Sequence, residues 1–223
     1  MSKVIERGNS AYPLIHNSND VALLTLEPRA FWGEMREREH CVQFYETDAF
    51  LLNSLSGFVC AALDAGEAAI VIATKAVRES LDEHLQTSGV NVLAARSALE
   101  FISLDAAETL SKLMVTGLPQ PERVREVIGE VIASATKNGR RVRIFGEMVA
   151  LSWAEGNYEA AIRLEELWND LQRTHPFSLL CAYPMKSFDG DSLALPLGEV
   201  CAGHTRVIPA ESYTSLTNTD ERL

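Results

Sequence analysis

Residues 68–73 read AAIVIA, a run of six apolar residues that follows Gly66 and Glu67 and precedes Thr74. A strand buried on both faces of a parallel sheet has this unbroken apolar pattern, whereas a strand with one wet face alternates apolar and polar residues. The flanking residues agree, because glycine can end a preceding helix and threonine can begin the next one. The run therefore predicts a central strand of a parallel sheet.

Strand-like and helix-like patterns alternate on both sides of this run. The other strand-like runs are 41–45 (CVQFY), 99–104 (LEFISL), 141–145 (RVRIF) and 177–183 (FSLLCAY). Helical apolar spacing separates them, most clearly over residues 121–135, where Val124, Ile128 and Ile132 share one face. This alternation predicts an α/β fold with three layers (α/β/α), in which a mostly parallel sheet carries helices on both faces.

The length of 223 residues suits one domain with tails. No repeat, low-complexity tract or linker divides residues 40–210, so we expect a single α/β domain there. Residues 1–39 have a mixed composition and are expected to form an N-terminal arm. Residues 211–223 are polar and are expected to form a flexible C-terminal tail.

Charge and cysteine usage indicate the compartment and the partners. The chain has 31 acidic and 20 basic residues and a formal charge of −11, which disfavours direct binding to nucleic acid. No window reaches the roughly 18 apolar residues of a membrane span, and the polar residues 1–10 do not form a secretory signal. Cys41, Cys60, Cys181 and Cys201 form no CxxC pair, so we expect free thiols and a cytoplasmic protein.

Several common chemistries lack their motifs. A phosphate-binding loop needs glycines and a lysine, but residues 45–48 read YETD and the chain has no Gly-Lys dipeptide. The GxSxG motif of serine hydrolases is absent. The histidines are scattered, and the lone CxxH of Cys201 and His204 lacks two further ligands, so it fits a helical turn with an inward thiol better than a metal site. We expect no catalytic residue, no cofactor and no metal.

Ligands of parallel α/β proteins bind beyond the carboxyl ends of the strands. The residues expected at those ends are Tyr45, Glu46, Thr74, Lys75, Asp105, Glu147 and Tyr183. Their rings, carboxylates, hydroxyl and amine suit a small polar or semi-polar molecule, so they are the candidate ligand-binding residues. Lys75 also has a structural interpretation, as a solvated residue of a first helical turn.

Some of these residues also have structural interpretations. Thr74 and Asp105 are well placed to cap helices. Glu147 lies between an apolar strand and an apolar segment, and a buried carboxylate needs partners or changes its pKa. Glu147 is therefore either a functional carboxylate or an acceptor for a backbone amide or for an arginine such as Arg141 or Arg143.

Longer strings in the chain resemble the MEDS family, the sensory domain named for methanogens, methylotrophs and a dichloromethane-responsive repressor. The most specific strings are RIFGEMVALSWAEGN (143–157), AAIRLEELWNDL (160–171) and HPFSLLCAYP (175–184). Further similar strings are HCVQFYETDAFLL (40–52), LDAAETLSKLMVTGLP (104–119) and CAGHTRVIPAESY (201–213). The resemblance covers about residues 40–213, which is most of the chain.

The resemblance implies a RecA/KaiC-like domain without a phosphate loop that senses small molecules, such as hydrocarbon derivatives, in bacterial and other prokaryotic signal transduction and transcription regulation. Family members are often fused to helix-turn-helix or histidine kinase modules. Residues 1–39 are too few for such a module, so we expect a non-catalytic domain that acts in trans on a separate histidine kinase or transcription regulator, and a homodimer is compatible with that role.

Two other functions fit the same residues. One is an atypical nucleotide-binding ATPase in which Glu147 activates the attacking water. The other is a protein-interaction regulator without a ligand, which binds its partner through an exposed apolar face or through Phe31 and Trp32 of the arm.

Overall fold

The computed structural model describes residues 32–188 and 194–212, which form a six-stranded sheet covered by helices. All of its strand pairs are parallel, and the order is β3-β2-β6-β7-β1-β8. The strands are β1 (His40–Tyr45), β2 (Ala68–Ala73), β3 (Phe101–Asp105), β6 (Val142–Gly146), β7 (Ser178–Pro184) and β8 (Arg206–Ile208). β4 (Met114–Val115) and β5 (Leu118–Pro119) form a separate antiparallel pair.

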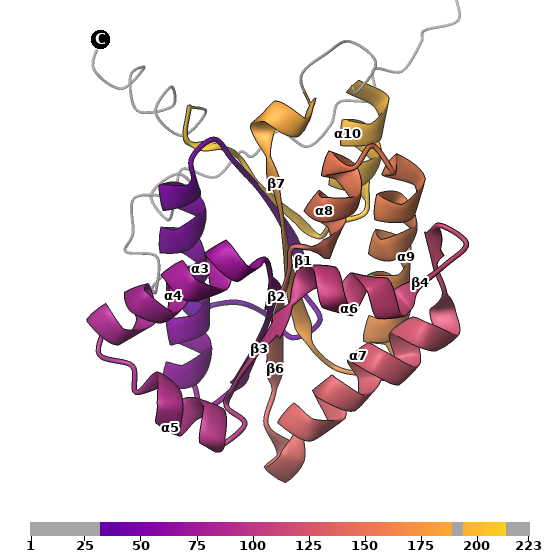
Figure 1. Cartoon of the computed structure of the whole chain (residues 1–223). Helices are drawn as coiled ribbons and strands as arrows, with labels where there is room; N and C mark the ends of the chain where they lie inside the picture. Colours follow the sequence, from indigo (N-terminus) through magenta and orange to yellow (C-terminus); the bar gives the residue numbers. More distant parts are fainter. Residues whose placement is uncertain (1–31, 189–193, 213–223) are drawn as a thin grey trace, which may run out of the picture.

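Helices cover both faces of the sheet (Figure 1). The first face carries α3 (Asp48–Asp64), α4 (Lys75–Thr87) and α5 (Val92–Ser97). The second face carries α6 (Ala106–Leu113), α7 (Pro121–Ala135), α8 (Met148–Ala154), α9 (Tyr158–Thr174) and α10 (Ala194–Ala202). Each face has its own apolar core against the sheet. The predicted α/β/α layering is therefore confirmed.

The chain path creates three switch points in the sheet. From β1 the chain reaches β2 and then β3 through the helices of the first face, and it returns to β6, β7 and β8 through those of the second face. The neighbouring strands β2 and β6 therefore send the chain to opposite faces. The neighbours β1 and β7 do so too, and so do β2 and β3, because α6 after β3 lies on the second face. Crevices that bind ligands form at such positions, outside the carboxyl ends of the strands.

Local sequence signals explain where most helices begin. Asp105 begins α6, with its Oδ1 accepting a hydrogen bond from the Glu108 amide at 3.0 Å, and Asn157 begins α9 in the same way through the Ala160 amide at 3.1 Å. Pro121 is the first residue of α7, where a missing amide hydrogen costs nothing. The five predicted strands are confirmed to within two residues at each end. The short elements α5, α8 and β8 were not predicted.

Residues 32–39 pack against the first face of the domain. The side chains of Trp32 and Met35 are buried in the same core as α3, and the Trp32 ring lies edge-on to Phe58 with 5.2 Å between ring centroids. Trp32 is therefore covered within this chain, and Phe31 lies outside the described residues. Among the described helices, none is long and apolar enough to cross a bilayer.

Candidate functional site

Glu147 joins the two strands at the first switch point. It follows β6, and its backbone amide donates to the carbonyl of Ile72 in β2 at 2.9 Å. Its Oε2 accepts a hydrogen bond from the backbone amide of Thr74, just beyond β2, at 2.7 Å. Only 8% of the residue is exposed. Glu147 is thus an acceptor for a backbone amide, one of the two structural partners considered for it.

The charge of Glu147 is disfavoured where it lies. Burial raises its pKa, the hydrogen bond from Thr74 partly offsets this, and the Asp48 carboxylate adds to it. Tyr45, at the end of β1, is also buried, and burial together with the charges of Glu147 and Asp48 raises the pKa of its phenol. A perturbed carboxylate at a switch point is a candidate contact for a ligand that donates a hydrogen bond or carries positive charge.

The two arginines considered as partners of Glu147 lie at the opposite end of the sheet. Arg143, which is 2% exposed, donates from Nε to Glu67 at 2.5 Å and from a terminal nitrogen to the carbonyl of Trp32 at 2.6 Å. Arg141 lies 3.2 Å from the other carboxylate oxygen of Glu67. This ion-pair network anchors residues 32–39 and does not reach the carboxyl edge.

Two further predicted residues have structural partners. Asp105 caps α6 and also pairs with Arg78 at 2.8 Å, and the Glu108 amide and Arg78 hold its pKa below the usual value. Lys75 is exposed and lies 3.7 Å from Glu79 one helical turn away. Neither side chain joins Glu147 and Tyr45.

The turn after β1 is occupied by a carboxylate from the C-terminal segment. Glu211 accepts hydrogen bonds from the backbone amides of Glu46 at 2.7 Å and Thr47 at 2.9 Å, and from the Thr47 hydroxyl at 2.7 Å. The Glu46 side chain in turn accepts a hydrogen bond from the Ser212 hydroxyl. The backbone donors that a phosphate loop would offer to a nucleotide are therefore bonded to the protein's own acid.

Tyr183 also lies at the carboxyl end of its strand, β7, but its side chain is buried in the core of the second face. Its hydroxyl donates to Glu165 Oε1 at 2.9 Å, and its ring packs edge-on against Trp153 with 5.6 Å between centroids. The structure therefore brings Tyr45, Thr74 and Glu147 to the carboxyl edge and places Tyr183 against a second polar site.

That second site is a group of four side chains, His40, Glu165, Cys181 and His204, which we call the buried cluster. Glu165 Oε2 lies 3.3 Å from His40 Nε2, 3.4 Å from His204 Nε2 and 3.4 Å from Cys181 Sγ. His40 Nε2 and Cys181 Sγ are 3.5 Å apart. The side chains of His40 and His204 are 1% and 0% exposed. Four separate elements, β1, α9, β7 and the turn before β8, supply these residues.

The cluster perturbs the protonation of its members. Burial opposes the charged form of Glu165, but His204 and His40 outweigh it and hold the pKa of this carboxyl well below the usual range. Burial also opposes a charged imidazole, yet the Glu165 carboxylate raises the pKa of His204. Burial, followed by the charge of Glu165, raises the pKa values of Cys181 and Tyr183. The cluster was missed because its members are far apart in the sequence.

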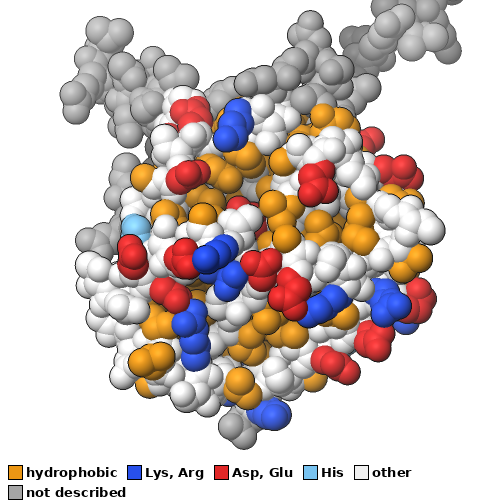
Figure 2. Space-filling view, viewed as in Figure 1, with side chains coloured by type: hydrophobic (Ala, Val, Ile, Leu, Met, Phe, Trp, Pro, Cys, Tyr) orange, Lys and Arg blue, Asp and Glu red, His pale blue; other side chains and the backbone are white. Residues whose placement is uncertain are grey.

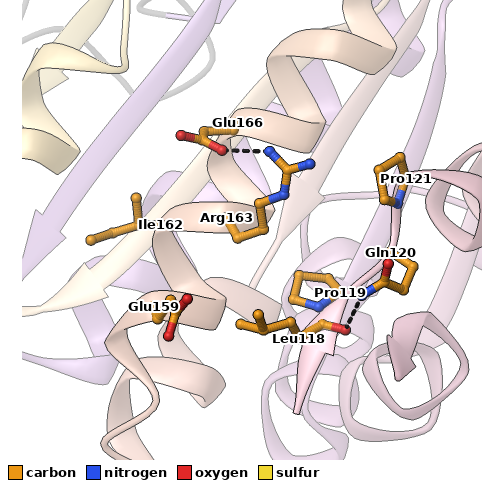
Figure 3. Close-up of a pocket in the computed structure, with 8 residues that line it drawn as sticks. All are labelled: Leu118, Pro119, Gln120, Pro121, Glu159, Ile162, Arg163 and Glu166. Carbon is orange, nitrogen blue, oxygen red and sulfur yellow. Dashed lines mark hydrogen bonds and ion pairs between the residues drawn. The ribbon is translucent and has the colours of Figure 1, made fainter. Parts of the chain in front are cut away.

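An open groove of about 600 Å³ lies on the second face, between the β4–β5 pair, the start of α7 and α9 (Figure 3). It is lined by Leu118, Pro119, Gln120, Pro121, Glu159, Ile162, Arg163 and Glu166. Arg163 and Glu166 form an ion pair at 2.6 Å along its wall. None of the predicted ligand-binding residues lines this groove. Over the face shown in Figure 2, acidic and basic side chains are interspersed among exposed apolar ones.

A comparison with protein families matches residues 39–197 to MEDS, the MEthanogen/methylotroph, DcmR Sensory domain. No curated protein matches the chain. The matched segment includes every strand of the main sheet except β8, and it includes both Glu147 and three members of the buried cluster.

Proposed function

The chain belongs to the MEDS family, a family of sensory domains, and we propose on this premise that it is a non-catalytic sensor that binds a small molecule at the carboxyl edge of its sheet. The observation that carries the proposal is the position of Glu147. A nearly buried carboxylate with a raised pKa bridges β2 and β6 at a switch point, where α/β proteins bind ligands.

The charges at this edge favour one class of ligand. Glu147, Glu46 and Glu211 are carboxylates, so an anionic phosphate would be repelled, whereas a neutral hydrogen-bond donor or a small cation would relieve the buried charge of Glu147. The buried residues Met148 and Val149 follow Glu147 in α8, and the buried Tyr45 ends β1 at the same edge. We therefore propose a short hydrocarbon derivative with one polar group, an alcohol or an amine, and we include a halomethane as a third candidate on the family resemblance alone.

The signal is a population shift between two arrangements of the helices that follow β2 and β6. Glu147 directly precedes α8, and its carboxylate holds the amide of Thr74, which precedes α4. A ligand that binds the Glu147 carboxylate competes with that hydrogen bond and so changes the positions of α4 and α8 relative to each other. The shift can be no larger than the difference in the ligand's affinity for the two arrangements.

The output in this proposal is a separate signalling protein, a histidine kinase or a transcription regulator, reached in the cytoplasm without direct binding to nucleic acid. The described residues form one α/β unit, and the match to the sensory domain covers most of it. The four cysteines form no disulfide with one another, and three of them are buried, which supports a reducing compartment. The net charge of −11 supports a protein partner over DNA.

A thermal-shift panel tests the proposal. Methanol, methylamine, dichloromethane and ATP with Mg²⁺ are titrated against the wild-type protein, Glu147→Gln and the control Glu155→Gln, an exposed residue at the end of α8. A ligand that binds the folded state raises Tm in a concentration-dependent way. We expect one of the three small molecules to raise Tm in the wild type and in Glu155→Gln but not in Glu147→Gln.

Other results of the panel favour the alternatives. A saturable rise in Tm with ATP and Mg²⁺ that Glu147→Gln alters would support the atypical ATPase. It would refute a sensor that does not bind nucleotides. No shift with any compound, together with retention of a signalling protein by the immobilised chain, would support a regulator that works without a ligand.

A further inference from the structure

We propose that the buried cluster of His40, Glu165, Cys181 and His204 is a binding site for a zinc ion. This inference is independent of the ligand proposed at the carboxyl edge, because the cluster lies in the core of the second face. It rests on the spacing of four ligand atoms, the orientation of two imidazoles, and the balance of charge in a site closed to solvent.

The separations within the cluster fit the ligand atoms of a tetrahedral metal site. Zinc bonds to nitrogen, oxygen and sulfur are about 2.0–2.3 Å long, so tetrahedral ligand atoms lie about 3.3–3.8 Å apart. The separations between Glu165 and its three neighbours are 3.3, 3.4 and 3.4 Å, and the His40–Cys181 separation is 3.5 Å. All four ligand atoms lie within 4.8 Å of one another. The two separations between Glu165 and the histidines exceed the length of about 2.9–3.0 Å that is usual for an N–H···O hydrogen bond, whereas the two separations to sulfur fit a hydrogen bond as well as a metal.

Both imidazoles are held with Nε2 directed into the cluster. His204 Nδ1 lies 2.6 Å from the carbonyl oxygen of Val200, which can only accept, so this nitrogen carries the proton. His40 Nδ1 lies 2.9 Å from Asn169 Oδ1. The amide nitrogen of Asn169 donates to the carbonyl of Gly203 at 3.3 Å, which fixes its oxygen toward His40. Metal-binding histidines are oriented by such bonds.

When each imidazole is neutral and protonated at Nδ1, its Nε2 lone pair faces the cluster beside the Glu165 carboxylate. His204 Nε2 is buried and has no hydrogen-bond partner, although Glu165 Oε2 is 3.4 Å away. Without a metal, a second proton on the imidazole could pair it with the carboxylate, but at 3.4 Å this contact is longer than a normal N–H···O hydrogen bond. A cation between them turns the same lone pairs into ligands.

The ligand set selects the metal. Two imidazoles, one carboxylate and one thiolate form a borderline-soft N₂OS set, which suits Zn²⁺ and not Mg²⁺ or Ca²⁺, since those ions take six or more oxygens. The charges of Glu165 and the Cys181 thiolate sum to −2 and neutralise Zn²⁺, so no net charge is buried. Binding transfers the thiol proton of Cys181 to solvent as the sulfur–zinc bond forms.

A metal here would hold β8, the outermost strand next to β1, in place. His204 lies between α10 and β8, a strand of only three residues that pairs with β1. Thr205 adds a hydroxyl hydrogen bond to the His40 carbonyl at 2.8 Å. The segment that follows β8 carries Glu211 to the turn after β1. Zinc binding should therefore slow hydrogen exchange over residues 206–212.

The test uses the full chain, stripped with a chelator and then titrated with Zn²⁺ or Co²⁺. We expect uptake of one ion per chain and, with cobalt, a thiolate-to-metal charge-transfer band in the near ultraviolet. Cys181→Ser should lose that band, whereas Cys201→Ser should keep it. Cys201 is a matched control because it is the thiol of the CxxH pair but is not among the clustered ligands.

Further variants separate binding from folding. His204→Gln should weaken Zn²⁺ binding, the control His84→Gln should not, and Asn169→Ala should weaken it about 10–100-fold because it releases the His40 ring. If the folded wild type takes up neither ion in a saturable way, or if Cys201→Ser abolishes the cobalt band and Cys181→Ser does not, the inference is wrong. Should the cluster variants fail to fold, the wild-type uptake and cobalt spectrum decide alone.

Discussion

Neighbouring glutamates on α9 allow a controlled test of the buried cluster. Glu165 is 5% exposed and contacts two histidines, Cys181 and the Tyr183 hydroxyl. Glu166 pairs at the surface with Arg163, where the two side chains are 58% and 39% exposed. Replacing each by alanine removes the same carboxylate from adjacent positions of one helix, so any difference in stability comes from the surroundings.

The expected losses differ several-fold. Breaking a buried ion pair by removing one partner costs about 3–5 kcal/mol, and a chain of this size loses about 2–4 °C in Tm per kcal/mol. Glu165→Ala should therefore lower Tm by about 6–20 °C. An exposed ion pair contributes about 0–1 kcal/mol, so Glu166→Ala should lower Tm by no more than about 4 °C.

The assay is thermal unfolding followed by circular dichroism on chelator-treated protein, which keeps metal binding out of the comparison. Guanidinium unfolding of the same proteins converts the difference into free energy. If the two variants melt within a few degrees of each other, Glu165 is not the centre of a buried electrostatic network, and the contacts described for the cluster do not stabilise the fold.

Three further predictions concern the carboxyl edge and residues 32–39. The pKa of Glu147 is raised above its ordinary value of 4.5 in the folded protein, so the free energy of unfolding falls as pH rises through this interval. The difference in Tm between Glu147→Gln and the wild type should therefore grow, in favour of the variant, between about pH 4 and pH 8. A difference that stays constant with pH would contradict this. Glu211→Ala should cost about 1 kcal/mol in chemical denaturation, because three donors at the turn after β1 lose their acceptor. Trp32→Ala should cost about 3–5 kcal/mol by the same measurement, since its ring is 1% exposed against Phe58; a loss below about 1 kcal/mol would show that residues 32–39 are dispensable for the core.

The parallel sheet was predictable because burial on both faces leaves an unbroken apolar run, as in residues 68–73, and because helix caps such as Asp105 and Asn157 have local signals. The short elements were not predictable: α5 has 6 residues and β8 has 3, too few for a period to show. Their positions depend on pairing with elements already in place, which local propensity does not encode.

The two polar sites also differ in how far the sequence could predict them. Glu147 could be singled out from its local sequence, because a carboxylate between two apolar segments is unusual. The buried cluster joins residues separated by up to 164 positions (204 − 40). One partial signal existed. His40 shares one face of its strand with every second residue, the buried Val42 and Phe44, so its side chain must point to the same core. Glu165 had a similar signal, since it lies four residues after Ala161 and three before Trp168 on the apolar face of α9.

The most direct test of a sensor that recognises its ligand through Glu147 is a ¹⁵N–¹H NMR titration of the full chain. We predict that methanol, methylamine or dichloromethane shifts the amide resonances of Thr74 and Glu147 in a saturable way, and that ATP with Mg²⁺ leaves those of Glu46 and Thr47 in place. Saturable movement of the Glu46 and Thr47 amides with ATP, while all three small molecules leave Thr74 and Glu147 unchanged, would contradict the proposal.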